Sequence, residues 1–185
     1  MKILLALPFP PPNYGPSIYS SNLFKCLVDL GFDPRKVNTE INNKTKDIGR
    51  ISLFKFFKVL KISLKIFKNS LNSYTFLNIH LSAQGLIRTF IHHLSAIYAK
   101  DICLIFHEGN IKKFYNEYNF ICKLIFRYLV SKSNYIILVD NQQVESLKNF
   151  VEENKLHLIG AYREDTYKEI VKKNYIVFYS NLIKE

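Results

Sequence analysis

The chain has 185 residues, of which 48% are hydrophobic and 22% charged, a composition typical of a folded domain rather than a disordered segment. Its three cysteines are widely spaced in apolar runs, which excludes a disulfide framework and a cysteine metal site, so we expect buried, reduced thiols. The formal net charge of +11 favours anionic partners such as lipid head groups, nucleic acid or phosphorylated sugars.

The first elements of the chain alternate between apolar runs and helical patterns. Residues 3–7 form a continuous apolar run, which predicts a strand buried on both faces. A proline-rich loop follows, and Ser17 is expected to cap a helix over residues 17–30. Residues 35–39 predict a weak second strand, and residues 51–68 predict a long helix.

The same alternation continues to residue 159. We expect further strands over residues 74–80, 102–106, 135–139 and 156–159. We expect helices between them over residues 84–99, 118–131 and 142–151. The pattern predicts an α/β fold, a Rossmann-like open parallel sheet with helices on both faces.

The rhythm breaks after Gly160. A polar helix over residues 164–173 and an apolar strand over residues 175–179 are expected there. We therefore expect residues 1–162 to form one domain, and residues 163–185 to be a connection and the first strand of a truncated second domain. The alternative is a swapped or edge strand that completes the same sheet.

Three segments follow strands of the expected sheet, where parallel α/β folds bind ligands. The first is the loop that contains Tyr14 and Gly15, since glycine lets a ligand approach the backbone and a helix N-terminus can hold an anion. The second contains His80, and the third contains His107 and Glu108, which could bind a sugar hydroxyl or accept its proton. The structural alternatives are a capped turn and ordinary structural histidines.

The helix over residues 51–68 has an unusual lysine pattern. Its lysines recur every three or four residues and so share one face: Lys55, Lys58, Lys61, Lys65 and Lys68. The apolar residues are expected largely on the opposite face: Leu53, Phe56, Val59, Leu60, Leu64, Ile66 and Phe67. One interpretation is a surface helix that packs its apolar face on the sheet, and the other is a helix on anionic lipid.

These segments, taken in order, resemble the N-terminal domain of family-four-type retaining glycosyltransferases, which have the two-domain GT-B fold. The resemblance is carried by residues 2–30, by the strand that ends at His80, and by residues 104–109 with the turn at His107. Residues 135–150 resemble a later strand–helix unit, and residues 176–185 resemble the start of the nucleotide-sugar domain.

The resemblance implies that this chain is the acceptor-side half of an enzyme that moves a sugar from a nucleotide sugar to a lipid-linked or polysaccharide acceptor in cell-surface glycan synthesis. It implies that His107 is a catalytic residue that touches the donor sugar, and that Tyr14, Gly15 and Ser17 face the donor. Pro16 stands where a second glycine is common in the family.

The acceptor side is expected to use the remaining polar residues at the strand ends: Asn13, His80, Glu108 and Asn110. The five lysines of residues 51–68 are expected to bind the membrane. No cofactor and no metal are expected, and the chain alone is expected to lack transferase activity.

The location and the competing functions follow from the same features. The N-terminal apolar run ends at Pro8, too early for a signal peptide, and lysines interrupt every long apolar stretch. We therefore expect a cytoplasmic protein, with the inner face of the cell membrane as a peripheral site. The alternative function is a non-enzymatic α/β module that binds an anionic ligand or a membrane surface. Nucleic acid is the less favoured partner, since the sequence contains no nucleic-acid motif that we recognise.

Overall fold

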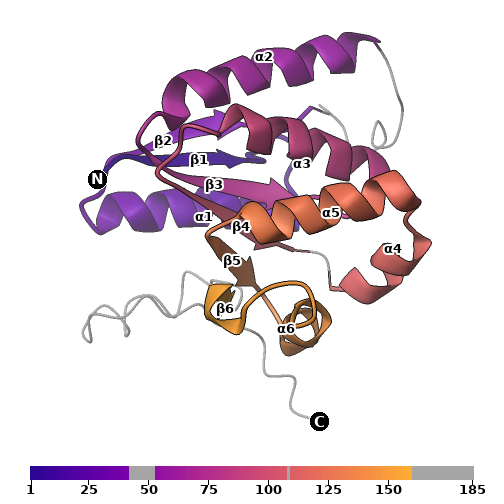
Figure 1. Cartoon of the computed structure of the whole chain (residues 1–185). Helices are drawn as coiled ribbons and strands as arrows, with labels where there is room; N and C mark the ends of the chain where they lie inside the picture. The colour runs from indigo at the N-terminus through magenta and orange to yellow at the C-terminus, as the bar shows by residue number, and fades with distance from the viewer. Residues whose placement is uncertain (42–52, 108, 160–185) are drawn as a thin grey trace.

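A six-stranded, all-parallel sheet forms the centre of the molecule (Figure 1). The computed structural model describes residues 1–41, 53–107 and 109–159. The strand order is β2-β1-β3-β4-β5-β6. The strands are β1 (Ile3–Leu7), β2 (Pro34–Asn38), β3 (Tyr74–Ile79), β4 (Asp101–Phe106), β5 (Tyr135–Leu138) and β6 (Leu156–Leu158). The prediction of an open parallel α/β sheet is therefore confirmed.

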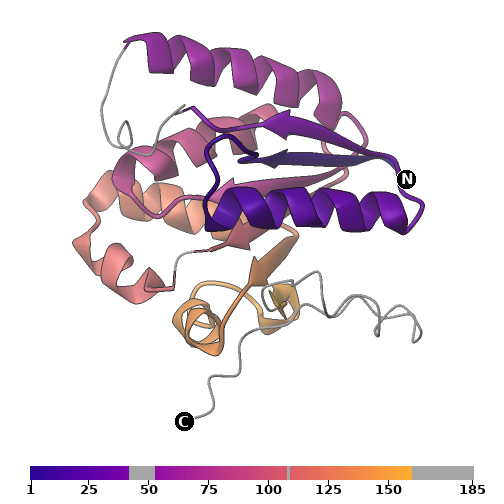
Figure 2. The same ribbon diagram turned by 180° about the vertical axis from the view of Figure 1, so that it is seen from behind.

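Helices cover the sheet on both faces, as predicted. They are α1 (Gly15–Asp29), α2 (Leu53–Ser70), α3 (Ala83–Ser95), α4 (Ile111–Glu117), α5 (Phe120–Lys132), α6 (Asn141–Leu147) and the 3-10 helix η2 (Glu153–Lys155). Helix α1 lies on one face of the sheet, and α2, α3 and α5 lie side by side on the other (Figures 1 and 2). This division follows from the strand order, because the crossover to β2 runs in the opposite direction to the later ones.

The strands contribute side chains to two hydrophobic cores, one on each face of the sheet, because successive side chains of a strand point to opposite faces. On β4, Leu104 and Phe106 face the core under α2, α3 and α5, whereas Cys103 and Ile105 face the core that α1 covers. All four side chains are buried. Burial on both faces explains why this strand reads as one continuous apolar run.

Several predicted boundaries need correction. Helix α1 begins at Gly15 with Tyr14 as its N-cap, so Ser17 is not the cap residue. Helix α3 ends at Ser95 rather than at residue 99, and the short helix α4 was not predicted. The expected helix over 164–173, strand over 175–179 and domain boundary after residue 162 lie outside the described residues.

The orientation of α2 also differs from the prediction. Its buried side is formed by Ile62, Ser63 and Ile66, while Leu64 and Phe67 are 62% and 47% exposed. The prediction placed these two residues with Ile66 on the face toward the sheet. Two apolar stripes run along α2, and the sheet contacts the one made largely of β-branched and small residues.

All three cysteines are free and buried, which confirms the expectation from their apolar settings. Within residues 1–41, 53–107 and 109–159, no helix is both long and apolar enough to cross a membrane.

Candidate functional site

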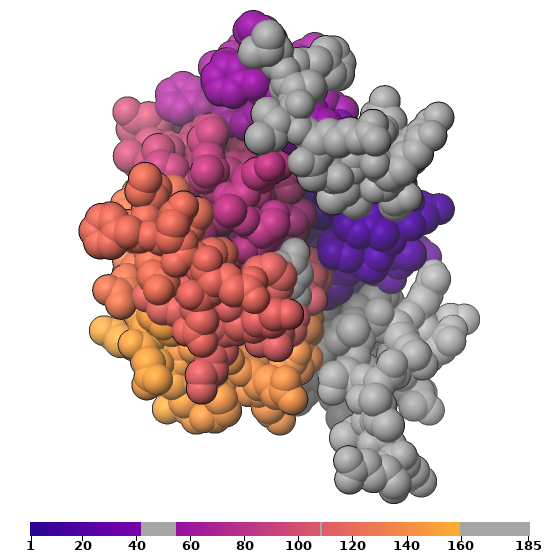
Figure 3. Space-filling view, turned by 90° about the vertical axis from the view of Figure 1, so that its right-hand side faces the viewer, coloured from indigo at the N-terminus to yellow at the C-terminus, as the bar shows by residue number. Residues whose placement is uncertain are grey.

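The point where the strand order reverses lies between β1 and β3. The chain leaves β1 toward β2 on one side, and β3 to β6 then follow on the other side. In open parallel sheets, the crevice at the carboxyl ends of two such strands is the usual ligand site. Figure 3 views this edge of the molecule, where indigo, magenta and red atoms from segments far apart in the sequence lie together.

The loop after β1 is held by Ser17. The backbone N–H of Tyr14 donates to Ser17 Oγ at 3.0 Å, and Ser17 Oγ lies 2.8 Å from the carbonyl oxygen of Pro12, to which it donates. Ser17 is fully buried. Its hydroxyl is thus engaged within the loop that was predicted to face the donor, and its contribution there is to fix the shape of the loop.

Gly15 lies on open surface at the start of α1. A Cβ atom added to Gly15 would meet no other atom within 4 Å. Pro16 has no N–H, and the N–H of Ser17 donates to the carbonyl oxygen of Tyr14 at 2.9 Å. Pro16 and Ser17 therefore offer no free backbone N–H to an anion. The open space for a ligand at this helix start is next to Gly15.

The Tyr14 side chain reaches the segment that follows β2. Its hydroxyl donates to Glu40 Oε2 at 2.5 Å. Burial and this carboxylate raise the pKa of Tyr14, and the nearby positive charge of Arg88 opposes the shift. The phenol therefore stays protonated, bonded to a carboxylate and within the electrostatic reach of a guanidinium.

His80 is packed against α3 at the end of β3. The ring atom Nε2 of His80 lies 3.0 Å from Asn78 Nδ2, and burial together with Arg88 and His107 holds the pKa of His80 well below its usual value. A Cβ atom added to Gly85 would come within 2.5 Å of the Cβ of His80. The glycine thus permits the helix to approach the strand end, and His80 is neutral and half-buried.

His107 follows β4 and packs against α1. Its ring lies edge-on to the ring of Tyr19, with 4.7 Å between the centroids. Burial lowers the pKa of His107 to about 4, so the imidazole is neutral at physiological pH. Its Nε2 atom is buried and has no hydrogen-bond partner among the described residues. A neutral imidazole with an unused ring nitrogen can donate or accept one hydrogen bond with a sugar hydroxyl, once the atoms that cover Nε2 move aside.

The structure does not bring the other residues expected at the acceptor side together with His80 and His107. Asn13 is exposed in the loop after β1, and Glu108 lies outside the described residues. Asn110 caps α4, because its Oδ1 accepts from the N–H of Lys113 at 3.0 Å. The structure therefore brings Tyr14, His80 and His107 to one edge and gives Asn110 a structural task.

Arg88 and Tyr19 belong to this edge and were not predicted. Arg88 acts electrostatically on Tyr14, His80 and His92, so its charge lies near the end of β3. The sequence contained one indication of Arg88, because it is the only lysine or arginine in α3. Tyr19 has no comparable signal in the sequence. It belongs to α1, and its side chain packs in the apolar core between α1 and the sheet. A guanidinium beside neutral rings suits an anionic, hydroxyl-rich ligand.

The predicted lysine row lies on α2. Lys58 reaches back to the carbonyl oxygen of Ile41 at 2.9 Å, which ties α2 to the chain after β2. Lys61, Lys65 and Lys68 are exposed, and Lys55 is partly buried. The lysines do share one side of the helix, but it adjoins the exposed apolar stripe rather than opposing it.

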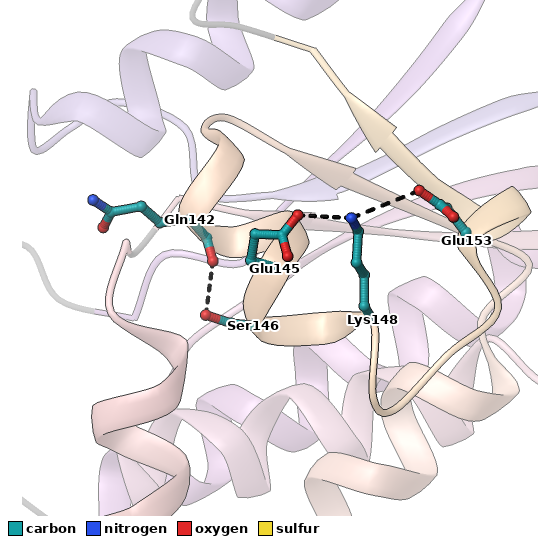
Figure 4. Close-up of polar contacts among 5 residues, drawn as sticks. All are labelled: Gln142, Glu145, Ser146, Lys148 and Glu153. Carbon is teal, nitrogen blue, oxygen red and sulfur yellow. Dashed lines mark hydrogen bonds and ion pairs between the residues drawn. The ribbon is translucent and has the colours of Figure 1, made fainter.

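A second concave region lies beside α6, far from the reversal point in the strand order. This groove of about 480 Å³ is lined by Ser131, Lys148, Asn149, Phe150, Val151, Glu152 and Lys155. Lys148 bridges Glu145 at 2.7 Å and Glu153 at 3.9 Å (Figure 4). Lys155 donates to the carbonyl oxygen of Ser131 at 3.2 Å. Both lysines of the groove are thus already engaged, so it is the weaker candidate for an anion site.

Two further histidines, His92 and His93, are adjacent and buried on α3. His93 Nε2 lies 3.4 Å from Ser133 Oγ, whereas Nε2 of His92 is buried and has no partner among the described residues. Within those residues, no three His, Cys, Asp or Glu side chains are grouped so that they could hold a metal ion.

Comparison with known proteins adds no assignment. No protein-family model matches the chain, and no curated protein matches it at a significant level.

Proposed function

We propose that this chain is the acceptor-side half of a GT-B glycosyltransferase, which moves a sugar from a nucleotide sugar to a lipid-linked or polysaccharide acceptor. The observation that carries the proposal is the position of His107. Its buried Nε2 has no partner among the described residues, and it lies at the carboxyl edge of a parallel sheet next to the reversal point. A sugar hydroxyl is a partner of matching chemistry.

The surroundings of His107 support the same ligand class. Gly15 leaves open space at the start of α1, and the positive charge of Arg88 lies near Tyr14 and His80. Open backbone suits close approach by a bulky ligand, and a guanidinium suits the phosphates of a donor or of a lipid-linked acceptor.

The residues of this edge have separate tasks in the proposed reaction. His107, held neutral by burial, binds a hydroxyl of the donor sugar and orients it. Tyr14 faces the donor from the loop after β1, and His80 lines the same edge, where the acceptor enters. Electrostatic stabilisation of the leaving diphosphate is assigned mainly to the second domain, which in this fold lies across the cleft.

The first test is the size of the native protein in its source cells, measured by immunoblot with antibody to this chain. A GT-B enzyme needs a second domain of ordinary size, so a band at roughly twice the mass of 21.7 kDa is expected. A band at the mass of the chain itself would leave no donor domain, and the alternative of a non-enzymatic binding module would replace the proposal.

A further inference from the structure

The outer surface of the layer formed by α2, α3 and α5 has an unusual charge distribution. The three helices carry nine lysines and arginines, five in α2, one in α3 and three in α5, and contain no Asp or Glu. They lie side by side on one face of the sheet, toward the viewer in Figure 1. A surface layer without carboxylates presents positive charge that its own side chains do not neutralise.

The same surface exposes large apolar side chains. On α2, Phe57 is 65% exposed and Leu64 is 62% exposed. An exposed apolar stripe runs along α2 and onto the residue after it, and consists of Phe56, Phe57, Leu60, Leu64, Phe67 and Leu71. Phe67 contacts Tyr98, which follows α3, with 5.7 Å between the ring centroids, so the stripe continues toward the next helix.

The neighbouring helices extend this apolar surface. Exposed side chains on α3 and α5 are Ile87, Leu94, Phe120, Ile121 and Leu124. The exposed lysines Lys61, Lys65 and Lys68 border the stripe on α2. An apolar surface bordered by lysines is the arrangement with which interfacial helices bind anionic bilayers.

We propose that the outer surface of α2, α3 and α5 is a membrane-docking face, in which Phe57, Leu60 and Leu64 enter the acyl boundary of an anionic bilayer. Lys61, Lys65 and Lys68 then contact the lipid head groups. Charge argues against a second copy of the chain as the occupant, since a two-fold contact would bring the same positive surfaces together. This face is distinct from the edge around His107, and its test does not depend on sugar transfer.

The chain contains no tryptophan, so the fluorescence of a single introduced tryptophan reports the polarity around one chosen position. The test places Phe57→Trp on the proposed face and Ile18→Trp on α1, where Ile18 is 48% exposed on the opposite side of the sheet. On addition of vesicles of phosphatidylcholine with phosphatidylglycerol, the emission of Phe57→Trp is expected to shift to the blue and that of Ile18→Trp to stay unchanged. Equal shifts at both positions, or none at either, would overturn the proposal.

Binding is then measured by vesicle flotation. Lys61→Glu with Lys65→Glu is expected to weaken binding to these vesicles at least about tenfold, because each lysine near an anionic surface contributes strongly. The matched control is Lys112→Glu with Lys113→Glu, two exposed lysines of α4, which is expected to change binding much less.

The apolar contribution is tested by Phe57→Ser with Leu64→Ser, compared with Ile18→Ser with Val28→Ser on α1. The first pair is expected to lower binding about tenfold or more, and the second to leave it nearly unchanged. All four side chains are exposed, so the fold is expected to persist, and circular dichroism checks it. Absence of vesicle binding by the unaltered chain, together with a dimer that the α2 variants dissociate, would show instead that this face is a self-association surface.

Discussion

The imidazole of His107 lies edge-on to the phenol of Tyr19, with 4.7 Å between the ring centroids. His107 follows β4, while Tyr19 belongs to α1, which follows β1, so the contact joins segments separated in the sheet by β3. The imidazole is therefore held by α1, which lies on the face of the sheet opposite to α3. A change at Tyr19 should reach the ligand edge through this contact.

The Tyr19 contact predicts a difference between two substitutions. Tyr19→Phe retains the aromatic ring and should keep His107 in place, whereas Tyr19→Leu removes the edge-on contact and should let the imidazole reorient. The ¹⁵N chemical shifts of the His107 ring measure its tautomer and surroundings. We expect them to change more in Tyr19→Leu than in Tyr19→Phe, and equal shifts in both variants would contradict the positioning role.

Substitution of two glycines by alanine is expected to affect the free energy of unfolding differently. In Gly85→Ala, the added Cβ would lie 2.5 Å from the Cβ of His80 and 2.8 Å from Ser82 Oγ, so we expect a loss of about 1–3 kcal/mol in the free energy of unfolding. Gly15→Ala meets open space and should leave this free energy within about 0.5 kcal/mol. Urea denaturation measures both, and an equal loss in the two variants would contradict the packing of α3 on the strand end.

The hydrogen bonds of the Ser17 hydroxyl predict a measurable contribution to stability at the start of α1. Ser17→Ala removes the acceptor for the N–H of Tyr14 and should lower the free energy of unfolding by about 1 kcal/mol. The matched control is Ser146→Ala on α6, whose hydroxyl donates to the carbonyl oxygen of Gln142 one turn earlier (Figure 4). It should change stability by less than about 0.5 kcal/mol, and equal losses would show that Ser17 has no special part in the loop.

The boundaries of the sheet could be predicted from the sequence because its central strands are buried on both faces. Residues 3–7 and 102–106 are uninterrupted apolar runs, and the observed strands β1 and β4 match them to within one residue. Helix α4 escaped prediction since it is short and rich in polar residues, although Asn110 provides a cap for it.

The face of α2 could not be predicted, because periodicity identifies apolar stripes without saying which one meets the sheet. Two such stripes run along this helix, one through Ile62 and Ile66 and the other through Leu60 and Leu64. The site shows the same limit, since His107 could be predicted from its place after a strand, whereas Arg88 comes to the edge only through the packing of α3.

Buried histidines predict acid sensitivity. Burial lowers the pKa of His92 to about 3 and that of His93 to about 4, below the ordinary value of 6.5. Between these values the unfolded chain binds more protons than the folded one, so the free energy of unfolding falls as the pH is lowered from 6.5 toward 4. The slope is at most about 1.4 kcal/mol per pH unit for each such histidine.

Replacement of one histidine tests this sign. His92→Leu should reduce the fall in stability between pH 6.5 and pH 4, as measured by urea denaturation at several pH values. The variant removes a buried imidazole whose Nε2 has no partner among the described residues, so it should not lower stability at neutral pH by more than about 1 kcal/mol. An unchanged slope would show that His92 does not titrate with a lowered pKa.

Sugar transfer by the native gene product tests the central claim most directly. The native protein and its His107→Gln variant are incubated with a panel of nucleotide sugars and a lipid extract of the source cells, and release of nucleoside diphosphate is measured. We predict release from at least one donor, a loss of about 100-fold in His107→Gln, and unchanged thermal unfolding of the variant. Absence of release with every donor, or equal rates in the two proteins, would contradict the account.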